Sequence, residues 1–279
     1  KLSAEMGENT PVLVSRAMDY MHDHSKKFVL IVMDGMSEFD WKILSRSFGD
    51  VEYDLSHVMA MIPTVTSISR QCLLSNKFPL ALENPWSQSK EKKEFIDCAR
   101  RMGYSDVQIG YDRGYEAEFG AAVSCAAIVI NDVDDMVHGQ LQGRTGMYND
   151  ISLLMQQERL VGTVKRMLQN GFDVYISSDH GNVPCTGMGK LMKTGVETET
   201  KGHRMVVLKD FADKSAILDK YPSVIEYPGY YLNKEFTYLL CGIGESFDAK
   251  GEEVMNHGGI TIDEVIVPFI KIKAVNNNG

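Results

Sequence analysis

An uninterrupted apolar run near the start of the chain constrains the fold more than any other feature. It spans Phe28 to Met33, follows two lysines and stops abruptly at Asp34-Gly35. A strand that is apolar at every position is covered on both faces, as happens in a parallel sheet with helices on either side. The run therefore predicts an α/β protein.

The rest of the chain continues this pattern. Ser37 is a suitable N-cap for a helix that directly follows the run. Alternation of buried strands and helices is typical of a doubly wound sheet, in which ligands bind beyond the carboxyl ends of the strands. The further elements predicted are strands at Ala126–Ile130 and Phe172–Ile176, strands at Met205–Leu208 and Ile262–Ile272 that complete the sheet, and one helix from Leu153 to Leu168 that ends before Gly171.

The length of 279 residues is compatible with one large domain or with two smaller ones. We expect a single domain over 1–279, with insertions at about 81–125 and 187–256 that mainly form walls over the site. The short strand Met205–Leu208 lies inside the second insertion. The chain begins at Lys1 rather than Met, which leaves open that it is a piece of a longer protein.

The charge and hydropathy exclude some classes of function. The formal net charge is -9, so the average surface repels duplex DNA, and a nucleic-acid ligand would need a local positive site. The sequence has no run of about 18 apolar residues that could cross a membrane, and we expect no signal peptide at its start. We expect a soluble, cytoplasmic protein that does not bind membranes.

The five cysteines are widely spaced and form no CxxC pair. An odd number at such spacing argues against a disulfide framework and against a thiolate zinc site. We expect most of them to pack in the core.

Polar residues follow several of the predicted strands. Asp34 ends the first strand, and Asp179 and His180 follow the strand at Phe172–Ile176. A glycine comes after His180 and two glycines come after His257, and glycine permits close approach of a ligand. Each position alone could equally be a turn or cap residue. Together they predict a functional site at one edge of the sheet.

Two other motifs offer further candidates. Thr66 precedes a predicted helix, where it could serve as N-cap, as nucleophile or as both, because the positive helix end would stabilise an alkoxide. Asp134 and His138 are four residues apart, so on a helical turn they face the same way and could bind one metal ion. An exposed ion pair is the alternative for that spacing.

The order of these motifs resembles that found in the alkaline phosphatase superfamily. Within it, the motif sequences are most similar to those of PglZ domains, over about Phe28 to Lys273. A departure is Asn76, which stands where many relatives have glycine; this affects a turn and not a ligand. The motifs that carry the resemblance are Asp34-Gly35, IPTVTSISR at 62–70 followed by LLS at 73–75, DDMVH at 134–138, SSDHG at 177–181 and HGGITIDEVIVP at 257–268.

The resemblance implies an alkaline-phosphatase-like fold, two metal sites and a threonine nucleophile. Thr66 is preferred to Thr64 as the nucleophile, because the family pattern uses the second threonine. Asp132 and Asp135 are the alternatives to Asp134, and the spacing to His138 decides between them. The implied ligands are Asp34, Thr66, Asp179 and His180 for one zinc ion, and Asp134, His138 and His257 for the other. Mixed carboxylate and imidazole donors favour zinc, with manganese as the alternative.

This ligand set implies a metal-dependent phosphoric ester hydrolase. Two divalent ions contribute +4, and three Asp carboxylates with a Thr66 alkoxide contribute -4. The nearly neutral sum suits a phosphodiester, so nucleotides or short oligonucleotides are the expected substrates, whereas a monoester would prefer an added cation. The candidates for such a cation are Lys190, Lys193, Lys201 and Arg204, with His203 beside them. Of this stretch we predict that His203, Arg204 and Lys190 bind substrate; the alternative is a solvated basic stretch. Arg70 is expected to pack or to form an ion pair.

Other functions remain as alternatives. One is a module of a phage-defence assembly of the BREX type, or of a signalling assembly, that mainly binds partner proteins or acts as a scaffold. A sulfatase is disfavoured because it needs Cys or Ser at the nucleophile position, where this chain has Thr66. A phosphomutase is disfavoured because the surrounding motifs are more similar to PglZ.

Overall fold

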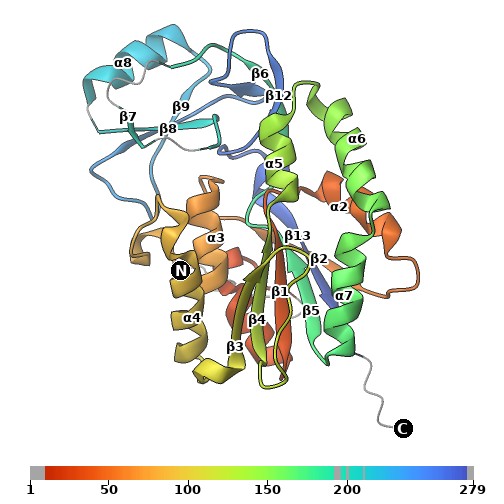
Figure 1. The fold of residues 1–279 in the computed structure, drawn as a ribbon. Coiled ribbons are helices and arrows are strands. Elements are labelled where there is room, and N and C mark those ends of the chain that lie inside the picture. The colour runs from red at the N-terminus through yellow and green to blue at the C-terminus, as the bar shows by residue number, and fades with distance from the viewer. Residues whose placement is uncertain (1–9, 192–195, 199–200, 210, 275–279) are drawn as a thin grey trace.

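The computed structural model describes residues 10–191, 196–198, 201–209 and 211–274. Its centre is a six-stranded sheet with the strand order β2-β13-β5-β1-β4-β3 (Figure 1). Five strands point the same way and β13 runs antiparallel to both of its neighbours, which confirms the predicted mostly parallel sheet. The strands are β1 (Phe28–Met33), β2 (Asp54–Met59), β3 (Ile109–Arg113), β4 (Cys125–Ile130), β5 (Asp173–Ser177) and β13 (Ile266–Ile272).

Helices cover both faces of this sheet, and successive residues of β1 enter two separate cores. Leu30 packs on the side of α1, α3 and α4, whereas Ile31 packs on the side of α2, α6 and α7 (Figure 1). Both faces of β1 are fully buried, as its apolar run predicts. The helices are α1 (Ala17–His24), α2 (Glu38–Leu44), α3 (Thr66–Ser75), α4 (Glu91–Arg101), α5 (Asp132–Gly139), α6 (Gly143–Gln156), α7 (Arg159–Gln169), α8 (Phe211–Lys220) and α9 (Ile262–Val265). Short 3-10 helices are η1 (Val14–Arg16), η2 (Ser45–Ser47), η3 (Pro79–Ala81), η4 (Gln88–Lys90) and η5 (Asp106–Gln108).

Two smaller sheets lie beyond the carboxyl ends of the parallel strands (Figure 1). One is antiparallel, has the order β7-β8-β10-β9 and contacts α8. The other has the order β11-β6-β12. Their strands are β6 (Val183–Gly187), β7 (Val196–Thr198), β8 (Met205–Leu208), β9 (Ile225–Tyr227), β10 (Thr237–Leu240), β11 (Glu245–Ser246) and β12 (Glu253–Asn256). The range 187–256, expected as an insertion, contains most of them.

Some predicted elements differ in the structure. Met205–Leu208 is strand β8 of the four-stranded sheet and not part of the main sheet, because a short apolar run does not specify which sheet it joins. The strand predicted over Ile262–Ile272 begins only at Ile266, because a capping box of Thr261 and Glu264 starts the short helix α9 before it. The single helix predicted from Leu153 to Leu168 is two helices, α6 and α7, since Glu158 between them has φ +54°. Helix α7 ends before Gly171 as predicted; its C-cap is Asn170, and Gly171, at φ +80°, is the next residue.

The range 81–125, expected mainly as a wall over the site, does place its segment 86–88 beside Thr66, but most of the range belongs to the main fold. Its strand β3 is the edge strand of the main sheet, and its helix α4 packs on α3. Apolar residues of α4, among them Phe95 and Cys98, belong to the core under α3. None of the helices in the described part of the chain combines the length and the apolar character needed to cross a membrane.

Candidate active site

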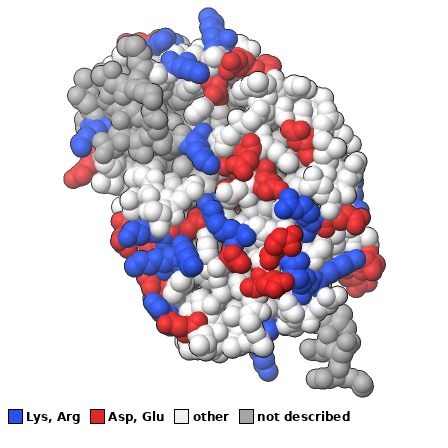
Figure 2. Space-filling model, in the orientation of Figure 1, with Lys and Arg blue, Asp and Glu red and all other residues white. Residues whose placement is uncertain are grey.

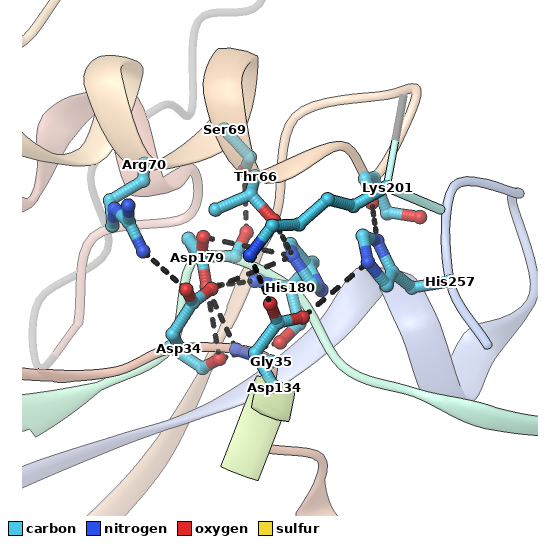
Figure 3. Close-up of polar contacts among 12 residues, drawn as sticks. Asp34, Gly35, Thr66, Ser69, Arg70, Asp134, Asp179, His180, Lys201 and His257 are labelled. Atoms are coloured by element: carbon cyan, nitrogen blue, oxygen red, sulfur yellow. Dashed lines mark hydrogen bonds and ion pairs between the residues drawn. The ribbon is translucent and has the colours of Figure 1, made fainter. Parts of the chain in front are cut away.

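The seven side chains predicted as metal ligands come from separate parts of the chain and meet at the carboxyl edge of the main sheet. All of them except His138 are labelled in Figure 3. They follow β1, β5 and β12 or lie on α3 and α5, and all except His138 are buried. Helix α5 is the element that brings the Asp134 and His138 side chains together, as their spacing predicts. The seven are Asp34, Thr66, Asp134, His138, Asp179, His180 and His257.

The first group surrounds the imidazole of His180. Its Nε2 lies 2.9 Å from Thr66 Oγ1, 3.8 Å from Asp34 Oδ1 and 3.7 Å from Asp179 Oδ2. Asp34, Asp179 and His180 offer ligand atoms that all lie within 4.8 Å of one another. The group therefore has the size and the donor types of a metal site.

The second group surrounds one oxygen of Asp134. Oδ1 lies 3.2 Å from His138 Nε2 and 3.5 Å from His257 Nε2, and the two imidazole nitrogens are 3.2 Å apart. Asp134, His138 and His257 again have ligand atoms within 4.8 Å of one another. The rings of His180 and His257 stack with centroids 4.0 Å apart, so the two groups are adjacent.

Backbone groups fix the orientation of both buried imidazoles. His180 Nδ1 donates to Gly181 O at 3.0 Å, and His257 Nδ1 donates to Thr64 O at 2.8 Å. A carbonyl oxygen only accepts, so in each ring the proton is on Nδ1 and the lone pair of Nε2 points at the acidic groups. Metal-binding histidines are usually held this way.

Each of the two strand-end carboxylates is held through one oxygen and leaves the other unpaired. Asp179 Oδ1 accepts from the backbone N–H groups of Gly35 and His180, both at 3.1 Å. Asp34 Oδ2 accepts from Arg70. The opposite oxygens, Asp179 Oδ2 and Asp34 Oδ1, are buried without a hydrogen-bond partner, and so are both carboxylate oxygens of Asp134.

Such unpaired buried carboxylates are costly, and a divalent cation at each group would compensate for them. Burial and the adjacent Asp179 charge raise the pKa of Asp34 well above its ordinary value, although Arg70 opposes this. Burial and the neighbouring His180 lower the pKa of His257 well below its ordinary value, so His257 is neutral, as a metal ligand must be. The residues present thus fit two cations.

Thr66 is the first residue of α3, and the N-cap is Val65, which makes no side-chain cap hydrogen bond. The positive end of the helix therefore faces the site beside the Thr66 hydroxyl. Ser69 Oγ, one turn later, donates to Asp179 O at 2.5 Å and ties the helix to the end of β5. The alternative Thr64 donates instead to Gly259 O at 2.9 Å.

A buried ion-pair network supports the site from behind. Arg70 is completely buried and joins Asp34 to Glu91, whose Oε2 accepts from Arg70 Nε at 2.7 Å. Glu91 Oε1 accepts from Tyr111 and, at 2.9 Å, from Arg113. The ion pair expected of Arg70 is confirmed, and sequence reasoning missed that it ends on a site carboxylate. The sequence signal for this contact is that Arg70 lies four residues after Thr66, on the same face of the predicted helix.

Three residues predicted to bind substrate are not among the groups that surround the candidate metal sites. Arg204 is buried and donates to Glu264 Oε1 at 2.9 Å, so its guanidinium stabilises the turn after His257 rather than facing a substrate. His203 pairs with Asp248 at 2.6 Å, and Lys190 lies exposed on the surface. Lys193 lies outside the described residues.

Lys201, the remaining candidate, does reach the site. Its Nζ lies 3.7 Å from Asp134 Oδ2, and Figure 3 shows the side chain extending in front of the site toward Thr66 and Asp134. Lys201 also lines a cavity together with Thr66.

The glycines after the histidines accommodate protein groups rather than a ligand. A Cβ on Gly181 would lie 1.9 Å from the carbonyl oxygen of Asp263, and one on Gly259 would lie 2.8 Å from Glu264 Oε2. The close approach inferred from the sequence is therefore real, but the approaching groups come from the turn and helix α9 after His257.

Comparisons with known proteins identify the family and the fold. Residues 13–272 match the model of one protein family, described as the BREX system PglZ alkaline phosphatase-like domain. No curated protein sequence matches the chain.

Several solved structures share the fold. Murine ectonucleotide pyrophosphatase/phosphodiesterase 5 has a TM-score of 0.59 at 12% identity, with 88% of each chain covered. The human protein of the same name has a TM-score of 0.56 at 15% identity, covering 88% of this chain and 87% of that one. Phosphonoacetate hydrolase from Sinorhizobium meliloti has a TM-score of 0.50 at 11% identity, covering 91% and 92%. One further structure of the murine protein is an inactive threonine-to-alanine variant in complex with AMP.

Proposed function

Because the chain belongs to the family of BREX system PglZ alkaline phosphatase-like domains, we propose that it is a two-zinc phosphodiesterase with Thr66 as its nucleophile. The substrates proposed are nucleotides or short oligonucleotides, and manganese is the alternative metal. One observation carries the proposal: Thr66 Oγ1 lies at the positive end of α3, in contact with one of two adjacent groups of metal-ligand type.

The proposed ligands divide as the two groups do. Asp34, Asp179 and His180 hold one ion together with Thr66, and Asp134, His138 and His257 hold the other. When bound, the ions supply Lewis acidity that favours the Thr66 alkoxide and neutralises charge on the phosphate.

The chain's own groups then carry the reaction. Thr66 Oγ1 attacks phosphorus, a P–Oγ1 bond forms, and the bond to the leaving alcohol breaks on the opposite side. Water later hydrolyses the phosphothreonine and restores the hydroxyl. The N–H groups at the start of α3 stabilise the phosphoryl oxygens. The inactive threonine-to-alanine variant of the murine protein, in complex with AMP, supports both a threonine nucleophile and a nucleotide substrate here.

Charge alone does not choose between a diester and a monoester. The ions and their four anionic ligands sum to about zero, which suits a diester, and Arg70 is balanced by Glu91. Lys201 adds one positive charge close to Asp134, and this is the added cation that a monoester would prefer. Basic and acidic side chains are interspersed over the face shown in Figure 2, which suits a short substrate better than a long polyanion.

The test measures bound zinc and manganese and the hydrolysis of matched chromogenic diesters and monoesters, for the chain, Thr66→Ala and Thr66→Ser. We expect two ions per chain, diester cleavage, a loss of at least roughly 10³-fold in kcat for Thr66→Ala and partial activity for Thr66→Ser. A chain without bound metal, or an alanine variant as active as the parent, would contradict the proposal.

The family match also supports a role inside an assembly. We propose that the domain acts in the cytoplasm with partner proteins of a BREX-type defence system, and that it is one domain in which 187–256 forms a cap. A scaffolding role is the alternative. In cells that carry the working system, Thr66→Ala abolishes protection against phage if catalysis is needed, and leaves it intact if the domain only binds partners.

A further inference from the structure

A cavity of about 260 Å³ opens directly beside Thr66. One wall is the start of α3 and the residue before it, and a second wall is the segment 86–88 that leads into α4. The side chain of Lys201 closes a third side. The residues that line it are Val65, Thr66, Ser67, Trp86, Ser87, Gln88 and Lys201.

The position of this cavity selects which part of a substrate can enter it. In an in-line displacement the leaving group departs opposite the attacking Thr66 oxygen. A space that Thr66 itself lines is therefore open to the substituent that stays on phosphorus, and not to the group that leaves.

The wall opposite α3 is held in place by several contacts. Gln71 is buried on α3, and its Nε2 donates to Asn84 O at 3.0 Å and to Ser67 O at 2.5 Å. Trp86 N donates to Asn84 Oδ1 at 3.3 Å. The Trp86 ring stacks on Tyr238 of β10, with centroids 6.2 Å apart and an interplanar angle of 22°. An aromatic surface is thus fixed next to the proposed nucleophile before any ligand binds.

The lining has the chemistry that recognises a nucleobase. An indole provides a stacking surface, the Gln88 amide can donate and accept hydrogen bonds at a base edge, and the Lys201 ammonium is next to the position of the phosphate. Sites for drug-sized ligands occupy roughly 300–1,000 Å³, so this smaller cavity fits one base and not several.

We propose that the cavity binds the nucleobase of the nucleoside that remains on phosphorus, with Trp86 as the stacking residue and Gln88 as the residue that contacts the base edge. This inference rests on the proposed function of Thr66, because it assumes that phosphorus is attacked from the α3 side. The group retained on the phosphothreonine is then a nucleoside, and the leaving alcohol is unrestricted by this cavity.

The test compares two diesters with the same leaving group, thymidine 5′-(p-nitrophenyl phosphate) and methyl p-nitrophenyl phosphate, on the metal-loaded chain. We expect kcat/KM to favour the thymidine ester by at least about 10-fold. Trp86→Ala should lower that ratio by at least about 5-fold, toward 1, as expected for the loss of one stacked base, while Trp86→Phe keeps most of it. Tyr148→Ala removes an exposed aromatic ring on α6 as the matched control, and its ratio should equal that of the parent.

Equal cleavage of the two esters by the parent chain, or an unchanged ratio in Trp86→Ala, overturns the proposal. Calorimetric binding of thymidine 5′-monophosphate separates this inference from the proposed function. If neither ester is cleaved but the nucleotide binds and Trp86→Ala weakens binding, the cavity proposal stands and the phosphodiesterase proposal fails. If neither ester is cleaved and the nucleotide does not bind, both fail.

Discussion

The guanidinium of Arg70 and the carboxylate of Asp34 form an ion pair that is completely buried behind the candidate active site. Arg70 also pairs with Glu91, so one cation is shared between two carboxylates from different elements. The pairing leaves Asp34 Oδ1 unpaired and directed at His180. Arg70 therefore fixes which oxygen of Asp34 is available to a metal.

Replacing Arg70 by methionine should be strongly destabilising. Two buried carboxylates lose their shared counter-charge, and breaking a buried pair from one side costs about 3–5 kcal/mol. Urea unfolding measures this loss. The control Arg100→Gln removes a half-exposed guanidinium from surface ion pairs and should change stability by less than about 0.5 kcal/mol. A similar small change in Arg70→Met would show that the network adds little.

Removing metal should lower the melting temperature. Without cations the carboxylates of Asp34, Asp134 and Asp179 remain close together with unpaired buried oxygens. Zinc at 100 times its dissociation constant adds about 2.7 kcal/mol per site, which is roughly 5–10 °C for a chain of this size. Calorimetry before and after treatment with a chelator tests this, and re-addition of zinc should restore the transition. Magnesium in place of zinc should restore less, because imidazole donors disfavour it.

Zinc affinity should increase with pH above the ordinary pKa range of Asp. In the metal-free protein burial and Asp179 raise the pKa of Asp34, so a proton competes with the ion at Asp34 until the pH exceeds that raised value. The pKa of His257 is lowered, so His257 does not add to this competition. Because the folded, metal-free protein holds the Asp34 proton more tightly than the unfolded chain does, the contribution of Asp34 to the stability of the metal-free protein falls as the pH rises. Titration calorimetry in buffers of different ionisation enthalpy counts the protons released, and Asp34→Asn should release fewer. An affinity independent of pH would exclude this competition.

Lys201→Met should weaken the binding of a phosphodiester more than it slows the chemistry. A half-exposed ammonium that contacts a phosphate oxygen is worth about 1–2 kcal/mol, or a rise in KM of roughly 5- to 30-fold. Lys250→Met, at an exposed turn, is the matched control and should leave KM unchanged. Steady-state kinetics on a chromogenic diester separates KM from kcat. If both variants behave alike, Lys201 has no contact with substrate.

The sequence predicts which polar residues the fold brings together better than it predicts their surroundings. Asp34, Asp179 and His180 follow buried parallel strands, and Asp134 and His138 are one helical turn apart, so local patterns suffice to bring each set together. The main sheet follows from equally local signals, since β1 and β5 are apolar runs of strand length.

The roles of the basic side chains Arg204 and Lys201 were harder to predict from the sequence, because these roles depend on residues far away in the chain. Arg204 is buried against Glu264, 60 positions later, and Lys201 approaches Asp134 across 67 positions. No spacing rule identifies such pairs. The strand Met205–Leu208 shows the same limit, because its partners in β10 lie some 30 residues further on.

The proposed ligands of the second ion come from two different parts of the fold. His257 follows β12 of the outer three-stranded sheet, whereas Asp134 and His138 belong to a helix of the main fold. Without an ion, His257 contacts the main fold through the carbonyl oxygen of Thr64 at 2.8 Å, and Met255 of β12 packs in the core with α6. A cation bound by His257, His138 and Asp134 would link the outer sheet to the main fold. Opening of the outer sheet, and the exchange of its amide protons, would then depend on metal supply.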